Sequence, residues 1–409
     1  MAVGVLCAVQ GPAEAVLVQA VEASNGLAVT RRCADLVELL AAAEAGLGRL
    51  AIVSAELDHL DRSAVAALHA AGARVVCVAD QSRPWLVDRL AAFGADLVVP
   101  PPGDEAAARL VVEHAAALLE EVPDRVPSWL AAEPATEPRH RGRVAAVWGP
   151  TGAPGRTTVA VTLAAELAAL GRATLLVDAD TYGGAVAQVI GLLDEAPGIA
   201  AAVRAAAQGG LDAGSLARLS PFAAENLRVL TGVSRADRWP ELASAALDAI
   251  WPVARSLAEW TVVDSGFCLE RDEVLSYDTR APQRNAATLS ALEAADVVVA
   301  VGSGDPVGIA RLVRALAELD GLGLAAQRVV VANRVRASVS GPDPARGVAE
   351  ALARYAGVGE VLVVPDDRTA CDAALLAGQT LREVAPGSAA RKALGGLAAR
   401  LAAARPVRT

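Results

Sequence analysis

The sequence predicts an α/β protein with two doubly wound domains joined by a linker. Short apolar runs typical of buried strands alternate along the 409 residues with longer Ala- and Leu-rich segments of helical period. Aromatic residues make up only 3% of a sequence that is 54% hydrophobic, as expected for helices packed on strands of Ala, Val and Leu. A proline-rich, charged stretch indicates the linker. The predicted division is residues 1–120, 121–142 and 143–409.

The first predicted domain is flavodoxin-like. Its strand candidates are VGVLCAV, LAVTRRC, RLAIVSAEL, ARVVCVAD and DLVVPP, with amphipathic helical segments between them. This arrangement resembles the receiver domain of response regulators. Phosphorylation there needs acids after the first strand, an Asp at the end of the third, a Thr or Ser after the fourth and a Lys after the fifth. The corresponding positions hold Val9, Gln10, Ser54, Ala79 and Pro100. We therefore expect a pseudo-receiver that is not phosphorylated.

Composition excludes several classes of function. A net charge of −10 and a pI near 5.1 argue against a specific nucleic-acid partner. The five cysteines and four histidines show no metal-ligand spacing, as is typical of proteins in a reducing cytosol. No uncharged apolar run reaches the roughly 18 residues needed to span a bilayer. We expect a cytoplasmic protein, peripheral to the inner face of the membrane or the cell pole at most, with indirect or weak membrane association.

The C-terminal stretch SAARKALGGLAARLAAAR is a helix candidate with two possible roles. It carries basic residues and leucines, as membrane-surface helices do, but two adjacent glycines weaken it for insertion. We expect it to close the second domain rather than to bind lipid.

The second predicted domain carries the chemistry. Its strand candidates are RVAAVWG, ATLLVDAD, LRVLTGV, WTVVDSG, DVVVAVG, RVVVANR and EVLVVPD, and parallel crossover connections are expected between them. The first of these strands runs into GPTGAPGRTT, a glycine-containing turn before a helix, where backbone N–H groups can bind phosphate. The P-loop pattern G-x-x-x-x-G-K-[ST] is nearly met, but Pro150 replaces its first glycine and Arg156 its lysine.

Acidic residues end two of the predicted strands. Asp178 and Asp180 close LLVDAD, and Asp264 closes WTVVD. Such carboxylates can hold Mg²⁺ through water beside a P-loop. Strand-end acids can also simply cap the next helix.

The order of these motifs resembles that of the MinD/ParA family of deviant Walker ATPases, whose loop reads KGGxGKTT. TGAPGRTT aligns with that loop, with Thr151 at the family's first lysine and Arg156 at its second. VDADTYGG is similar to the switch I segment, and WTVVDSG to the Walker B strand with the start of switch II. VVVANR resembles the Asn-Arg of the base pocket, and VVPDD the loop beside the purine.

The resemblance implies ATP and Mg²⁺ as cofactors and a role for each matching residue. Thr157 would ligate Mg²⁺, with Asp178 and Asp264 behind it. Asp180 would position the attacking water, and Arg156 would stand in for the catalytic lysine. The residues implied in nucleotide binding are Gly152, Ala153, Pro154, Gly155, Arg156, Thr157, Thr158, Asn333, Arg334, Pro365 and Asp366.

The departures from the family pattern concern hydrolysis. The family's first lysine reaches the phosphates of a dimer partner, which the short, uncharged Thr151 does not do. Arg156 keeps a positive charge but presents a planar fork in place of a point charge. Losing one stabiliser of transition-state charge costs about 10² to 10³ in rate. We therefore expect ATP binding with weak hydrolysis, so whether the chain is an enzyme stays open.

A pseudo-receiver followed by a MinD/ParA-like ATPase resembles the CpaE/TadZ proteins, which localise the Flp (Tad) pilus assembly machine. The resemblance implies a positioning protein, a homodimer, and partners in pilus or secretion machinery. Septum-site regulators of the same superfamily are an alternative, with active ATP cycling and division partners. A nucleotide-free scaffold is a third. A polar stretch after the Walker B strand, residues 268–289, is either a phosphate-sensing or partner-binding segment or a solvated loop.

Overall fold

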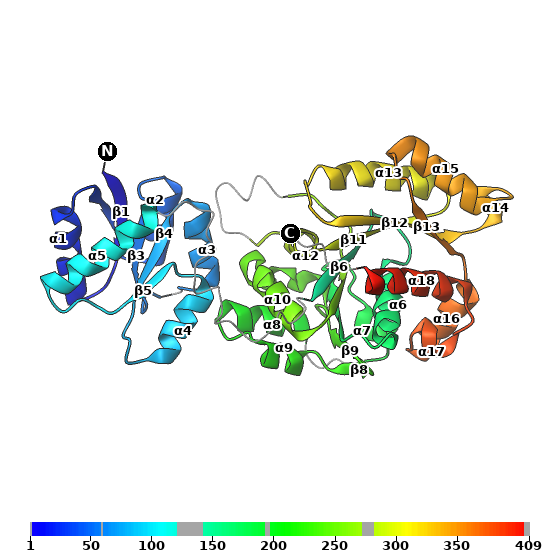
Figure 1. The fold of residues 1–409 in the computed structure, drawn as a ribbon, viewed down its shortest axis with the longest axis horizontal. Coiled ribbons are helices and arrows are strands. Elements are labelled where there is room, and N and C mark those ends of the chain that lie inside the picture. The colour runs from blue at the N-terminus through cyan, green and yellow to red at the C-terminus, as the bar shows by residue number, and fades with distance from the viewer. Residues whose placement is uncertain (1, 59, 121–141, 193–196, 272–281, 405–409) are drawn as a thin grey trace. The chain divides into compact units, whose positions relative to one another are not determined.

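The computed structural model describes residues 2–58, 60–120, 142–192, 197–271 and 282–404. They divide into two compact units, each built on one sheet (Figure 1). The predicted linker lies almost wholly outside the described residues, and the predicted domain boundaries remain predictions.

The first unit contains a parallel sheet of five strands in the order β2-β1-β3-β4-β5. This is the strand order of flavodoxin-like sheets. The strands are β1 (Val3–Ala8), β2 (Leu27–Arg32), β3 (Leu50–Ser54), β4 (Arg74–Val78) and β5 (Leu97–Val99). The helices are α1 (Pro12–Ala23), α2 (Leu36–Glu44), α3 (Arg62–Ala70), α4 (Pro84–Phe93) and α5 (Glu105–Glu120).

Each face of this sheet has its own apolar core, because neighbouring residues of a strand point to opposite faces. Leu6 of β1 packs in one cluster with residues of α2, α3 and α4. Val5 beside it packs in the other, with residues of α1 and α5. Figure 1 shows α1 and α5 on one side of the sheet. The predicted doubly wound architecture is confirmed.

The second unit contains an eight-stranded sheet in the order β13-β12-β11-β6-β10-β7-β9-β8. The strands are β6 (Arg143–Trp148), β7 (Thr174–Ala179), β8 (Phe222–Ala224), β9 (Leu227–Leu230), β10 (Trp260–Ser265), β11 (Val297–Ser303), β12 (Gln327–Val335) and β13 (Val361–Pro365). All pairings are parallel except that of β8 with β9.

The helices of this unit differ widely in length. They are α6 (Arg156–Ala169), α7 (Val186–Val189), α8 (Gly198–Ala207), α9 (Ala213–Leu219), α10 (Ser244–Leu257), α12 (Ala286–Glu293), α13 (Pro306–Asp320), α14 (Ala337–Ser340), α15 (Pro344–Ala356), α16 (Arg368–Ala377), α17 (Leu381–Val384), α18 (Ala389–Ala403) and the 3₁₀ helix η1 (Ala236–Glu241). Among the described residues, none of the helices is both long and apolar enough to cross a membrane.

Two helix layers cover this sheet. Val147 of β6 packs with α6 and α18, whereas Trp148 packs with α12, α13 and α15 on the other face. The strand β8 was not predicted: it has three residues and an exposed Phe222, too short a pattern to distinguish from a loop. As expected, α18 closes the domain, since Leu394, Leu397 and Leu401 are buried in the core with α6.

Candidate functional site

The turn between β6 and α6 is built to leave backbone N–H groups free. Gly152 and Gly155 have positive φ angles of 71° and 85°, which glycine adopts without strain. The helix α6 begins at Arg156, and no side chain caps its first turn. Uncapped N–H groups at a helix N-terminus, at the carboxyl edge of a parallel sheet, form a site suited to an anion.

Arg156 folds over this turn. Its guanidinium donates to the carbonyl oxygens of Gly149 and Pro150 at 3.3 and 3.5 Å, and it lies 3.4 Å from a carboxylate oxygen of Asp180. Its Nε is buried and has no acceptor among the described residues. These contacts are long for hydrogen bonds and weak. The arginine is therefore beside the anion site but only loosely held, so it is available to a bound phosphate.

The predicted acids meet opposite this turn. β7 and β10 are adjacent and parallel, and their register places Asp178 beside Asp264. Asp178 accepts hydrogen bonds from the N–H groups of Asp180 and Val186, at 3.2 and 3.1 Å. Asp180 accepts two more, from Tyr182 and the next residue. Both therefore shape the segment after β7, as strand-end capping acids do.

Asp264 lacks such partners. The residue is 1% exposed, and neither of its carboxylate oxygens accepts a hydrogen bond from a described residue. Burial raises the pKa of Asp264 well above its ordinary value, and the adjacent Asp178 raises it further. The Thr157 hydroxyl opposes this shift but does not reach hydrogen-bonding geometry with either oxygen. A buried carboxylate without a partner is costly and calls for a cation or bound water.

Burial also raises the pKa of Asp178, although the N–H groups of Val186 and Asp180 act in the opposite direction. Within the described ranges, no three His, Cys, Asp or Glu side chains are arranged to hold a metal ion by themselves. Such a cluster is not needed in sites where one side-chain hydroxyl and the phosphates of a nucleotide bind Mg²⁺. The role of the Thr157 hydroxyl as that ligand remains a prediction. The orphaned carboxylate of Asp264 fits a metal held through water.

The segments that follow β7 and β10 contact each other. The rings of Tyr182 and Phe267 lie 4.7 Å apart, and the Tyr182 hydroxyl donates to Asn285 at 2.9 Å. Trp148 at the end of β6 donates to the carbonyl oxygen of Phe267. The predicted switch segments and the phosphate-binding turn thus form one connected structure. Part of the polar stretch 268–289 lies outside the described residues, and its role stays open.

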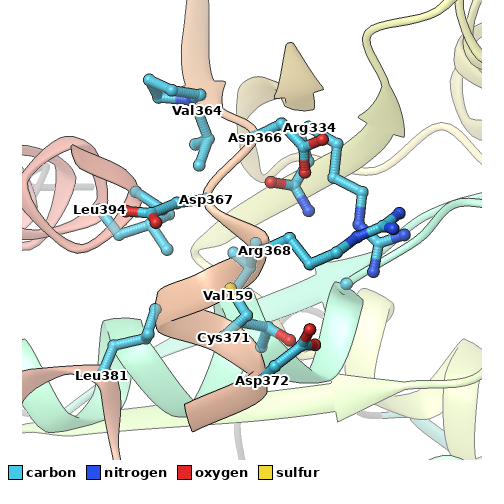
Figure 2. A pocket seen from close by; sticks show the side chains of 15 residues that line it. Val159, Arg334, Val364, Asp366, Asp367, Arg368, Cys371, Asp372, Leu381 and Leu394 are labelled. Atoms are coloured by element: carbon cyan, nitrogen blue, oxygen red, sulfur yellow. The ribbon is translucent and has the colours of Figure 1, made fainter. Parts of the chain in front are cut away.

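The residues predicted to bind the base line one pocket of about 110 Å³ (Figure 2). Asn333, at the end of β12, donates to the carbonyl oxygen of Pro154 at 2.9 Å and so joins the phosphate-binding turn to the pocket. Arg334 has a φ of 53°, unusual for a residue with a side chain. Pro365 and Asp366 come from the end of β13 and the loop after it.

Sequence reasoning missed two kinds of residue in this site. Gly184 and Gly232 leave room for Asp178: a Cβ at either position would come within 2.8 or 2.6 Å of its carboxyl group. Arg368, at the start of α16, extends into the same pocket as Arg334 (Figure 2). Gly184 lies within the quoted VDADTYGG motif, which was a usable signal, whereas nothing in the sequence singles out Gly232 or Arg368.

Comparison with solved structures identifies the fold. The cell division ATPase MinD of Pyrococcus furiosus matches 64% of this chain and 98% of its own, at 19% identity and a TM-score of 0.50. The ParA family ATPase of Chlorobium tepidum TLS matches 63% of this chain and 98% of its own, at 17% identity and a TM-score of 0.51. The chain has the MinD/ParA P-loop fold. No family model and no curated protein matches it.

A third structure of this fold is the septum site-determining protein MinD of Pyrococcus horikoshii OT3, which is complexed with Mg-ADP. It matches 64% of this chain and 96% of its own, at 17% identity and a TM-score of 0.51. At such identities the likeness establishes the fold, and the roles of individual residues remain predictions. The neighbours show the fold that the motifs indicate.

Proposed function

We propose that the chain binds ATP together with Mg²⁺ at the turn between β6 and α6. The single observation that carries this proposal is the unpartnered, buried carboxylate of Asp264, which faces a helix N-terminus with uncapped N–H groups. An anion bound at the turn would satisfy the uncapped N–H groups. A cation beside Asp264 would balance the charge of its buried carboxylate. The Mg-ADP complex of a neighbour with the same fold supports the choice of ligand.

The roles of the named residues follow from their positions. The N–H groups from Gly155 to Thr158 bind the phosphates, and Thr157 with Asp264 holds the metal. Bound Mg²⁺ would neutralise phosphate charge. Asp180 orients a water molecule, and Arg156 exchanges its weak contacts with loop carbonyls for the phosphates. Asn333 and Asp366 contact the base from the pocket of Figure 2.

Hydrolysis in this proposal is weak. The guanidinium of Arg156 is a planar fork, and Thr151 is uncharged, so neither reproduces the point charge of a lysine. Bound ATP then fixes a conformation or a homodimer rather than driving rapid turnover. This behaviour suits a cytoplasmic positioning protein of CpaE/TadZ type, with a pseudo-receiver in front and partners in a pilus or secretion machine, located at the cell pole or the inner face of the membrane.

A MinD-like regulator of division is the second candidate function. Two neighbours with the same fold are MinD proteins described in terms of cell division and septum-site determination. In this case the chain would cycle between ATP-bound and ADP-bound states at a useful rate. The two candidates differ in turnover: tight binding with negligible phosphate release supports positioning, and steady release supports cycling.

Calorimetric titration with ATP and Mg²⁺ tests the proposal. Wild type binds, whereas Asp264→Asn and Arg156→Ala bind about ten- to a hundredfold more weakly because each loses a charged contact. Two variants serve as matched controls with unchanged affinity: Glu259→Gln, which removes an exposed carboxylate just before β10, and Arg172→Ala, which removes an exposed arginine just after α6.

Two results of this titration would contradict the proposal. If wild type takes up no ATP at millimolar concentration with Mg²⁺, the turn is a structural relic and the chain is a nucleotide-free scaffold. If Asp264→Asn binds as wild type does, the orphaned carboxylate does not serve a metal. Without nucleotide, Asp264→Asn should also melt at a higher temperature, since a buried amide costs less than an unpaired carboxylate.

A further inference from the structure

A second, wider cavity of about 660 Å³ borders the phosphate-binding turn on the side of Thr151. Its walls come from the turn, from the segment that follows β10, and from one face of α13. The charged residues on the α13 wall include Arg311 and Arg314. None of these residues belongs to the predicted nucleotide contacts, and the cavity lies where the family pattern has a lysine and this chain has a threonine.

Arg311 lies directly on the turn. A Cβ built on Gly152 would stand 2.1 Å from Nη1 of Arg311, so the guanidinium occupies the space over the glycine's α-carbon. A Cβ at this position would displace the end of the Arg311 side chain. Gly152 also has a positive φ of 71°, so the same residue serves both the turn and the approach of the arginine. The cation therefore lies against the turn that precedes α6.

No described residue satisfies the guanidinium of Arg311. It has no ion pair and no hydrogen bond among the residues that the structure describes, and its side chain is exposed. By contrast, Arg328 nearby in the same unit pairs with Asp320. An arginine held against an amide-rich turn without an anionic partner has its full donor capacity available for a phosphate.

We propose that Arg311 binds the terminal phosphate of a nucleoside triphosphate at this turn. The inference rests on the proposed function and specifies its chemistry: α13 supplies, within the same chain, the positive charge that Thr151 lacks. Arginine suits this role because its fork donates two parallel hydrogen bonds to phosphate oxygens. The contact distinguishes ATP from ADP, since only ATP carries the outermost phosphate.

Titration of the full chain with ATP and, separately, with ADP, each with Mg²⁺, tests this assignment. In Arg311→Ala, ATP affinity falls by about ten- to a hundredfold, the value of one charge-assisted contact, while ADP affinity is unchanged. Arg311→Lys retains part of the ATP affinity, because it keeps the charge and loses the fork. Arg314→Ala, one turn further along the same wall of the cavity, binds both nucleotides as wild type does.

Several results would overturn the inference, and they differ from failure of the proposed function. If Arg311→Ala loses affinity for ATP and for ADP equally, Arg311 does not contact the terminal phosphate. If the ATP affinity of Arg311→Ala is unchanged, Arg311 does not bind the nucleotide at all. If wild type binds neither nucleotide, the proposed function fails first and this inference with it. Melting curves of each variant check the fold, which the loss of an exposed side chain should not disturb.

Discussion

Both sheets are built mainly of parallel strands, and they differ in what stands at their carboxyl edges. In the first unit, Glu56 after β3 and Asp80 after β4 are exposed, and both pair with Arg83 at 3.6 Å. In the second, Asp178 and Asp264 are buried side by side, and Asp264 has no partner among the described residues. Exposed carboxylates in ion pairs change the free energy of unfolding little. Buried and unpaired acids are costly.

The difference shows that architecture alone carries no chemistry. Both sheets present the edge at which ligands of open α/β sheets bind. The first unit also has a positive-φ glycine, Gly11, before the uncapped helix α1. Among the described residues, the buried carboxylate without a hydrogen-bond partner stands only at the edge of the second sheet. A strained or unsatisfied group that destabilises the fold is a sign of function. The acids described after β3 and β4 of the first unit are exposed and paired, which fits the expected pseudo-receiver.

The largest expected effect comes from restoring both family lysines. Thr151→Lys combined with Arg156→Lys should raise ATP turnover by about 10²- to 10³-fold, since each lysine supplies a compact charge where charge develops. Phosphate release at saturating ATP measures it. Arg172→Lys, at the far end of α6, is the control. Unchanged turnover with intact ATP binding would show that missing lysines do not limit hydrolysis.

A buried ion pair of the second unit should dominate its stability. Glu166 of α6, with a side chain 6% exposed, accepts two hydrogen bonds from Arg391 of α18 and a third from Arg382. Glu166→Gln leaves partly buried arginines without their anion and should cost about 3 kcal/mol of unfolding free energy. Thermal melting monitored by circular dichroism measures the loss.

The matched control for that variant lies on α18, the helix that carries Arg391. Arg400 of α18 pairs with Glu360, but both side chains are largely exposed. Arg400→Ala should therefore cost less than about 1 kcal/mol. Equal losses in the two variants would contradict the assignment of stability to the buried pair.

In the first unit, Asp96 should make stability dependent on pH. Burial alone would raise its pKa, but hydrogen bonds from His69 and the Val75 N–H, with the charge of Arg74, lower it below its ordinary value. Because the pKa of Asp96 is lower in the folded state, its ionised carboxylate stabilises the fold at pH values above its unfolded-state pKa of about 3.9. That contribution disappears as the pH falls through the folded-state pKa.

Asp96→Asn should accordingly lose about 1 to 3 kcal/mol at neutral pH. The gap to wild type should close as the pH falls below about 4, because the wild-type carboxyl is then protonated as well. Melting temperatures measured from pH 7 to pH 3 check this. A gap that is constant over the whole range would mean that the charge of Asp96 contributes nothing.

The smallest expected effect is at Ser54. Ser54→Asp places a carboxylate at the end of β3, where receivers carry their phosphoacceptor. We expect no incorporation of phosphate from acetyl phosphate and Mg²⁺, since Val9 and Gln10 still provide no acid to bind the metal. If the variant is labelled and wild type is not, the residue at position 54 alone decides whether the first unit can be phosphorylated.

Much of the second site could be predicted because its parts are local. The turn from Gly152 to Thr158 joins a strand to a helix, and the acids close strands, so alternation and spacing alone bring them to one edge of the sheet. The family resemblance implied that Asn333 lies beside the base, but its contact with Pro154, which spans 179 residues, was not predicted. The strand β8 was missed because three residues carry no readable period.

The sequence by itself determined the two sheets, the phosphate-binding turn and which acids end which strands, since these depend on neighbours along the chain. Only the tertiary structure decided that Asp264 is left without a partner, that Gly232 makes room for Asp178, and that Arg311 rests on Gly152. These features arise where elements far apart in sequence pack together. Burial and exclusion of water at such contacts are properties of the assembled fold.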